Sequence, residues 1–120
     1  MSLFKINAVA VNPREPERQT APIEALVDTG SELSWLPRDV LQAAGITPMR
    51  RRSFRTATNT VIERDVGYAI VRAEGHETID EVVLAEASDM HLLGVRTIEG
   101  FGVAVDSVGH RFVAQATLVV

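Results

Sequence analysis

Residues 23–37 read Ile-Glu-Ala-Leu-Val-Asp-Thr-Gly-Ser-Glu-Leu-Ser-Trp-Leu-Pro. The apolar run Ala25–Val27 is typical of a short buried strand, and it ends at the carboxylate of Asp28. A strand end holds a functional side chain rigidly, and the glycine two residues later lets backbone amides approach the carboxylate because it has no Cβ. Ser31 brings a hydroxyl within possible hydrogen-bonding reach of Asp28. The stretch therefore predicts a carboxylate at a rigid strand tip, surrounded by small donors.

The tripeptide Asp28-Thr29-Gly30 by itself leaves open a second interpretation, in which Asp28 only caps a turn of a different small β-barrel, because Asp and Gly are common turn residues. The neighbouring residues extend the pattern. Two hydrophobic residues precede Asp28-Thr29-Gly30-Ser31, and an apolar strand at Leu33–Leu36 follows and ends at a proline. This stretch resembles the active-site segment of aspartic proteases.

The whole chain looks like a single-domain member of the retropepsin-like group, the half-size relatives of pepsin that include retroviral proteases. The resemblance covers roughly residues 3–119. It implies an all-β structure with a small closed barrel-like retropepsin (acid protease) fold and one or two short helices, in a single domain over residues 1–120.

Length and composition agree with this class. A chain of 120 residues has room for one domain with a modest core, and both lobes of a pepsin-like enzyme would not fit. The net charge of −4 argues against nucleic-acid binding, which requires a basic face. The absence of cysteine excludes disulfides and thiolate zinc sites. With no signal peptide and no apolar run near the roughly 20 residues of a membrane span, we expect no membrane partner and a cytoplasmic location.

The remaining pattern predicts strands separated by polar turns. Pro37 at the first position of a helix and Gly45 just past its end are the expected punctuation of a short helix between them. A helix-turn-helix would need a second helix at once, and Thr47-Pro48 interrupts it. A second short helix is expected at residues 95–99. The expected strands cover residues 3–11, 23–27, 33–36, 49–55, 61–73, 78–85, 101–106 and 110–119.

Four arginines gather at Arg50-Arg51-Arg52 and Arg55. Such a run is compatible with a nucleic-acid patch, but beside 16 acidic residues it is more typical of a solvated strand face. Contact with an acidic substrate or partner is a third possibility.

The polar turn Thr56-Ala57-Thr58-Asn59-Thr60 lies between two extended segments, about thirty residues after Asp28. Retropepsins place there the flap that closes over a bound peptide, so the resemblance makes these five residues flap candidates. The chain departs from the family here, because retroviral flaps are rich in glycine and residues 46–66 contain none. A stiffer flap is therefore expected.

A second landmark is Leu92-Leu93-Gly94. It resembles the hydrophobic-hydrophobic-Gly element that retropepsins carry before a short helix near the C-terminus. In that fold the element packs beside the catalytic loop, and its glycine permits close backbone approach. The element has the expected position here, after the hairpin and before the short helix.

The sequence gives little support for a metal site or for a serine nucleophile. The histidines at 76, 91 and 110 are scattered, so no metal site and no cofactor are expected. Ser31 and Ser34 lack the glycine-flanked elbow of a serine nucleophile. Trp35 follows an apolar strand and is expected to serve packing.

The resemblance implies hydrolysis of a peptide bond by water held between two carboxylates that share one proton. The chain has one Asp-Thr-Gly, so the second carboxylate must come from Asp28 of a second copy in a homodimer. The family implies that Thr29 braces the dyad across the dimer and that Gly30 gives access to Asp28. The expected substrate is a peptide or an unfolded protein. The alternative is a catalytically inactive retropepsin-like module for dimerisation or peptide binding.

Overall fold

The computed structural model describes residues 3–120 and confirms an all-β fold with two short helices. The helices are α1 (Arg38–Ala43) and α2 (Val95–Gly100). The strands are β1 (Phe4–Val11), β2 (Ile23–Val27), β3 (Ser34–Pro37), β4 (Arg50–Arg55), β5 (Val61–Ala73), β6 (His76–Ala85), β7 (Leu92–Leu93), β8 (Val103–Asp106) and β9 (Arg111–Ala114).

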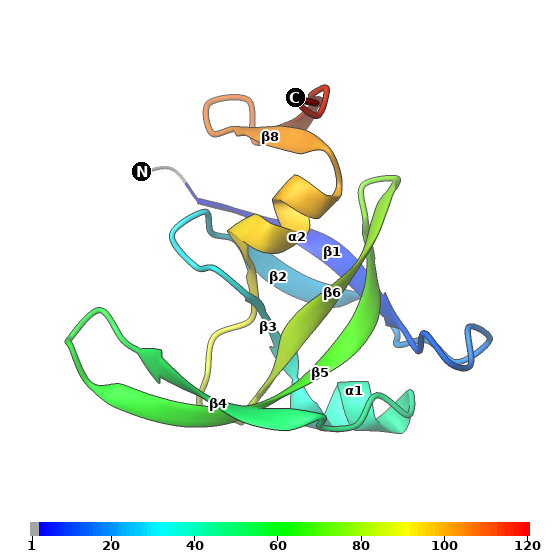
Figure 1. Ribbon diagram of the computed structural model, residues 1–120, viewed down its shortest axis with the longest axis vertical. Helices are drawn as coiled ribbons and strands as arrows, with labels where there is room; N and C mark the ends of the chain where they lie inside the picture. Colours follow the sequence, from blue (N-terminus) through cyan, green and yellow to red (C-terminus); the bar gives the residue numbers. More distant parts are fainter. Residues whose placement is uncertain (1–2) are drawn as a thin grey trace.

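Seven strands form one sheet in the order β1-β2-β7-β3-β6-β5-β4, and β5 pairs a second time, with β1. That second pairing sets Ala8–Val11 against Ile70–Ala73 in antiparallel register. Six strands therefore form a circuit of pairings, as a barrel-like fold requires. Within this sheet β4 lies outside the circuit, and with the adjoining part of β5 it forms a long hairpin that extends away from β1 and β2 (Figure 1).

The interior of the circuit is filled by aliphatic side chains, because the alternation of each strand sends every second residue inward. On β1 the buried positions Phe4, Ile6 and Ala8 alternate with exposed ones. A second, smaller apolar cluster lies on the other face of β5 and β6, where Leu33, Val66 and Val83 are buried and Trp35 and Phe54 pack against them. Phe54 belongs to β4, so this cluster holds the stem of the β4–β5 hairpin against the body of the protein.

The short helix after Pro37 is confirmed. Pro37 is its N-cap residue, and Gly45 adopts φ +79° just past its end, a left-handed conformation that glycine takes without a steric penalty. A Cβ there would also lie 2.5 Å from a guanidinium nitrogen of Arg18 and 2.7 Å from the side-chain nitrogen of Asn12, so these two side chains would have to shift.

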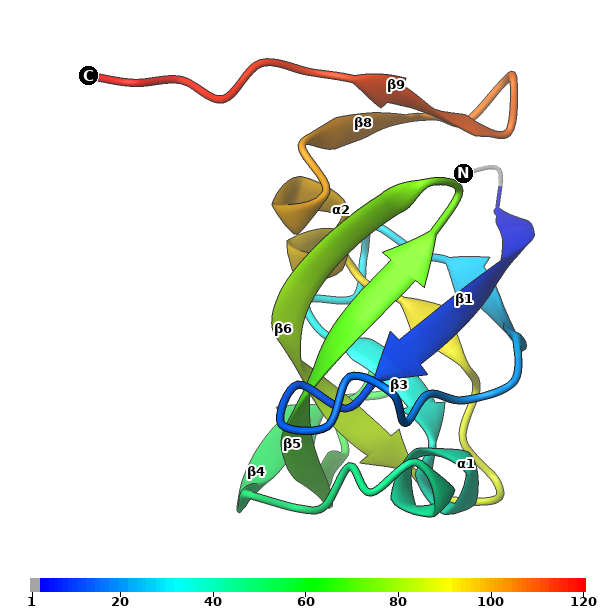
Figure 2. The ribbon, with the colours of Figure 1, turned by 90° about the vertical axis from the view of Figure 1, so that its right-hand side faces the viewer.

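The last expected strand, residues 110–119, is wrong in its extent. Strand β9 ends at Ala114 and pairs only with β8, in a separate two-stranded sheet. Residues 115–120 form no strand and are exposed, and they run away from the body of the protein (Figure 2). Their uncharged sequence favours extended structure, but no strand edge within residues 3–120 pairs with them.

None of the helices in the described part of the chain combines the length and the apolar character needed to cross a membrane.

Candidate active site

Asp28 follows the last residue of β2 and begins the Asp28 loop, which we define as residues 28–33. The loop turns tightly, because the Ser31 amide donates to the Asp28 carbonyl at 3.2 Å. The Gly30 amide donates to Oδ1 of Asp28 at 2.9 Å. Gly30 can approach the carboxylate this closely because it has no Cβ. The carboxylate is thereby held at the strand tip while it remains partly accessible to solvent.

The hydrogen bond expected from Ser31 to Asp28 is wrong for this structure. The Ser31 hydroxyl donates to the carbonyl of Leu33 at 2.7 Å. Ser31 therefore stabilises the second half of the Asp28 loop, and the Gly30 amide is the donor to the carboxylate. The difference has a simple cause, since the turn at residues 28–31 directs the hydroxyl toward the following residues of the loop.

Leu92, Leu93 and Gly94 lie directly beside the Asp28 loop. The parallel register of β2 and β7 sets Leu26 against Leu92 and Val27 against Leu93. The Asp28 amide donates to the Leu93 carbonyl at 3.0 Å, and the Val95 amide donates to the Ser31 carbonyl at 2.8 Å. Backbone hydrogen bonds thus fix the beginning and the middle of the Asp28 loop to the segment around Gly94.

There is no room for a side chain at position 94. A Cβ on this residue would lie 2.4 Å from the carbonyl oxygen of Leu33 and 2.9 Å from that of Ser31. Both atoms are backbone and cannot move aside without displacing the Asp28 loop.

Two buried hydroxyls support this arrangement, and sequence reasoning missed their role. Ser34 and Thr97 are both fully buried, and their hydroxyl oxygens lie 2.7 Å apart. The Ser34 oxygen also accepts a hydrogen bond from the Gly94 amide at 2.9 Å. The only signal in the sequence is a serine in an otherwise apolar strand, and its partners follow about 60 residues later.

The β4–β5 hairpin faces the Asp28 loop across a groove of about 660 Å³. Thr56 and Ala57 of the expected flap turn line the groove, whereas Thr58, Asn59 and Thr60 do not. The groove is lined by Asp28, Gly30, Ser31, Glu32, Leu33, Trp35, Arg52, Ser53, Phe54, Arg55, Thr56, Ala57, Asp89, Met90 and Leu92. The structure therefore brings Asp28, two of the flap candidates and Leu92 together around one space, and it also places Trp35 there.

The turn of the hairpin closes without glycine. The Thr56 amide donates to the Thr60 carbonyl at 2.8 Å, and the Asn59 amide donates to the Thr56 carbonyl at 2.9 Å. Asn59 adopts φ +65°, a left-handed conformation that Asn tolerates better than most residues with a Cβ. Asn59 thus replaces the glycine that the sequence lacks.

Three of the four arginines of β4, Arg50, Arg51 and Arg52, pair with acidic residues of the same chain, whereas Arg55 donates to the side-chain oxygen of Asn59. Arg50 and Arg52 both donate to Glu81, while Arg51 donates to Asp65 on the other face of the hairpin at 3.2 Å. Burial raises the pKa of Glu81, but hydrogen bonds from Arg50 and Arg52 outweigh it, so the pKa lies below its ordinary value. Of the three interpretations of this arginine run, the nucleic-acid patch loses support, because three of its four charges are compensated within the chain.

Asp89 forms one wall of the groove and is fixed by Arg64 of β5. Arg64 Nε donates to Oδ2 at 2.7 Å and Nη2 donates to Oδ1 at 2.9 Å. The hydrogen bond from Arg64 and that from the Glu86 amide lower the pKa of Asp89 below its ordinary value, against the effect of burial. The pair connects the hairpin to the segment that leads into β7.

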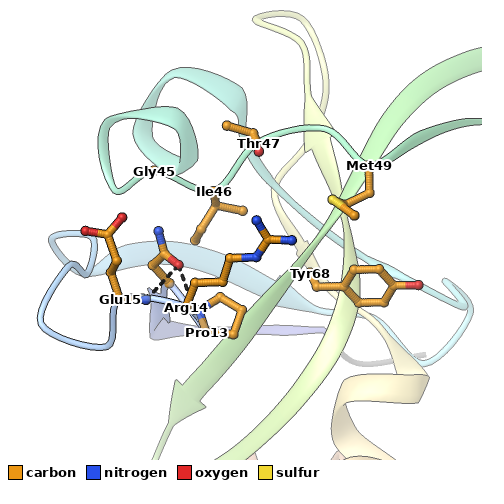
Figure 3. Close-up of a pocket in the computed structure, with 9 residues that line it drawn as sticks. Pro13, Arg14, Glu15, Gly45, Ile46, Thr47, Met49 and Tyr68 are labelled. Carbon is orange, nitrogen blue, oxygen red and sulfur yellow. Dashed lines mark hydrogen bonds between the residues drawn. The ribbon is translucent and has the colours of Figure 1, made fainter.

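A second hollow, of about 210 Å³, lies at the C-terminal end of α1 (Figure 3). Its polar residues include Arg14 and Glu15, whose amides both donate to the side-chain oxygen of Asn12. Tyr68 and Met49 form its other side. It shares no residue with the groove beside Asp28, so the candidate active site remains at the Asp28 loop.

None of the three histidines lines the groove, although His91 stands in the chain between the lining residues Met90 and Leu92. His76 and His110 belong to an aromatic cluster with Phe4, Phe101 and Phe112, in which the rings of Phe4 and His110 stack 5.2 Å apart. Within residues 3–120 no group of three or more metal-ligating side chains lies together.

The family model described as gag-polyprotein putative aspartyl protease matches residues 17–99 of the chain. A similar solved structure is described as a retropepsin-like aspartic protease from Rickettsia conorii. It is 23% identical, with 87% of this chain and 84% of that chain covered and a TM-score of 0.47. A search of curated proteins gives no match.

Proposed function

Because the chain belongs to the gag-polyprotein putative aspartyl protease family, we propose that it is an aspartic endopeptidase that acts as a homodimer. Each active site would contain Asp28 from one chain and Asp28 from its partner. The retropepsin-like character of the chain is shown by the family; the reaction and the dyad are our proposal.

One observation carries the proposal. Asp28 lies in a groove whose opposite wall is the β4–β5 hairpin, and residues of the hairpin turn line the same space. A carboxylate that only caps a turn would not need such an enclosure. An extended peptide that enters this groove would pass between the carboxylate and the hairpin.

The mechanism requires two carboxylates close to one another. Two adjacent like charges cannot both ionise without a large electrostatic penalty, so the pair holds one proton. The ionised Asp28 acts as general base and removes a proton from water, while the protonated Asp28 of the partner donates to the carbonyl oxygen of the scissile bond. The water attacks the carbonyl carbon directly, without a covalent intermediate.

Features of the single chain support assembly into a dimer. Thr29 and Gly30 are exposed in the protomer, although they adjoin the proposed reaction centre. The chain end after β9 is uncharged and exposed, with Leu118 and Val119 each 87% exposed. Exposed apolar residues of this kind favour association with another chain.

The groove also supports a peptide or an unfolded protein as substrate. Trp35, Phe54 and Leu92 give it an apolar wall, which an apolar side chain of the substrate would cover. A folded protein would not pass under the hairpin, whereas an extended chain would. A cytoplasmic location remains a prediction from the sequence.

The alternative is an inactive retropepsin-like module that binds peptides or dimerises. The hairpin turn without glycine favours it, because a stiffer flap opens and closes less readily. The two functions differ in one outcome, the cleavage of a bound chain.

The test compares wild type with Asp28→Asn on an unfolded, fluorescently labelled protein between pH 4 and 7. Asparagine keeps the shape of the side chain but cannot act as general base, so we expect a loss of at least about 10²-fold in kcat. Binding of the same substrate to Asp28→Asn should persist. Binding by both proteins without cleavage by either would establish the inactive module instead.

A further inference from the structure

Glu81 is a buried carboxylate that the proposed mechanism does not use. Its side chain on β6 is 4% exposed, and it accepts hydrogen bonds from two arginines of β4. Arg50 donates from Nε and Nη2 to Oε2 at 3.0 and 2.9 Å, and Arg52 donates from Nη1 to Oε1. Strand β5 lies between β4 and β6 in the sheet. Both arginines therefore reach across a whole strand to the same carboxylate.

Glu81 is also close to the Asp28 loop. The parallel register of β3 and β6 sets Ser34 against Val82, so Glu81 is level with the end of the loop. Arg52 Nη2 lies 4.0 Å from Glu32 Oε2, and the Arg52 guanidinium lies over the ring of Phe54 at 5.6 Å. Arg52 thus connects β4 with the body of the protein and with the Asp28 loop.

Apart from Phe54, which packs against Leu33, Val66 and Val83, the sequence of β4 does little to fix its register. Three consecutive arginines present similar side chains to both faces, so a slip of β4 by two residues would keep the alternation of faces. Depending on its direction, however, the slip would bring Phe54 to the present position of Arg52 or Pro48 to that of Arg50. Glu81 would then lose one of its partners, and a buried carboxylate without enough partners is strongly unfavourable.

We infer that Glu81 is a positioning residue, which sets the register of β4 against β5 and thereby the placement of the hairpin turn over Asp28. The effect on peptide cleavage rests on the proposed function. The effect on register does not, so the two can be tested separately.

Engineered cysteines measure the register directly, because the chain has no cysteine of its own. Ser53 and Glu63 are directly opposite one another and both exposed. A Ser53→Cys, Glu63→Cys pair reports the observed register, and a Ser53→Cys, Val61→Cys pair reports a slip of two residues. With Glu81 present, the first pair should form its disulfide about tenfold faster than the second, since opposite residues meet the geometry of a disulfide and diagonal ones do not.

In the Glu81→Gln background we expect this ratio of rates to fall, so that the first pair forms its disulfide at most about threefold faster than the second. In that variant neither register leaves a buried carboxylate short of partners, because the side chain at position 81 is a neutral amide. Glu77→Gln is the matched control. Glu77 lies on the same strand and face and pairs with Arg72 of β5, but it has no contact with β4 among the hydrogen bonds and ion pairs of residues 3–120. Its replacement should leave the ratio unchanged.

A second variant covers the case in which Glu81→Gln fails to fold. The triple replacement Arg50→Met, Arg52→Met, Glu81→Leu removes every charge of the group at similar volume, and it should lower the ratio in the same way. An unchanged ratio in either folded variant overturns the inference.

Peptide cleavage gives the second readout. If the proposed function holds, kcat/KM should fall about tenfold in Glu81→Gln and remain unchanged in Glu77→Gln, because the hairpin is misplaced over the substrate. A wild-type protein that cleaves no peptide contradicts the proposed function, while the cross-linking ratio still decides the role of Glu81.

Discussion

At the scale of the residue, Gly94 shows how closely the Asp28 loop is packed. Gly94→Ala would place a Cβ 2.4 Å from the Leu33 carbonyl oxygen, and this atom belongs to backbone that is held on both sides. We expect a loss of about 3 kcal/mol or more in the free energy of unfolding, at the upper end of what overpacking causes. Urea unfolding at a fixed protein concentration measures it.

Gly75→Ala provides the comparison for this prediction. A Cβ added to Gly75 would meet no heavy atom within 4 Å, but the φ of this residue is +78°, so alanine there suffers only backbone strain of about 1 to 2 kcal/mol. Because Gly94 has an ordinary φ of −87°, a loss there that is no larger than the loss in Gly75→Ala would contradict the predicted steric cost.

At the scale of the element, the pair Arg64–Asp89 joins β5 to the segment before β7, and it gives stability a defined dependence on pH. The pKa of Asp89 is lowered in the folded protein. Its contribution to stability is therefore fully present above the unfolded pKa of about 3.9 and is lost as the pH falls through the folded pKa. Asp89→Asn should cost about 1 to 3 kcal/mol at pH 7, and this difference from wild type should shrink below pH 4.

Urea unfolding of both proteins at pH 7 and near pH 3 checks the prediction. Glu77→Gln is again the control, since its pair with Arg72 is exposed and such pairs contribute about 0 to 1 kcal/mol. If the free energies of unfolding of wild type and Asp89→Asn differ by the same amount at both values of pH, the predicted pH dependence is contradicted.

The elements also show what the sequence can and cannot predict. Apolar alternation and turn residues are local, so strands such as β2 and the helix between Pro37 and Gly45 could be predicted. The Ser34–Thr97 contact and the two arginines on Glu81 join residues 29 to 63 positions apart, and nothing local encodes them. The hydrogen bond predicted for Ser31 is wrong for the opposite reason, because two local acceptors compete and the geometry of the turn chooses between them. Strand β9 is shorter than predicted, since a strand persists only where a neighbouring edge pairs with it.

At the scale of the whole molecule, the proposed shared dyad predicts how mixed dimers behave. Each active site would need one Asp28 from each chain, so one Asp28→Asn chain should inactivate the site. Equal amounts of wild-type and Asp28→Asn chains that exchange fully should give roughly a quarter wild-type dimers, half mixed dimers and a quarter mutant dimers.

Total activity at saturating substrate should then fall to about half that of the same amount of wild-type chains alone, because only a quarter of the dimers remain active while the number of dimers doubles. A mass-tagged subunit confirms that exchange is complete, and the protein concentration must lie above the dimer dissociation constant. Independent sites with one Asp28 each would leave the wild-type contribution undiminished. Undiminished activity after confirmed exchange would therefore refute the dyad across the dimer, because a site completed by a single chain cannot be inactivated by its neighbour's Asp28→Asn.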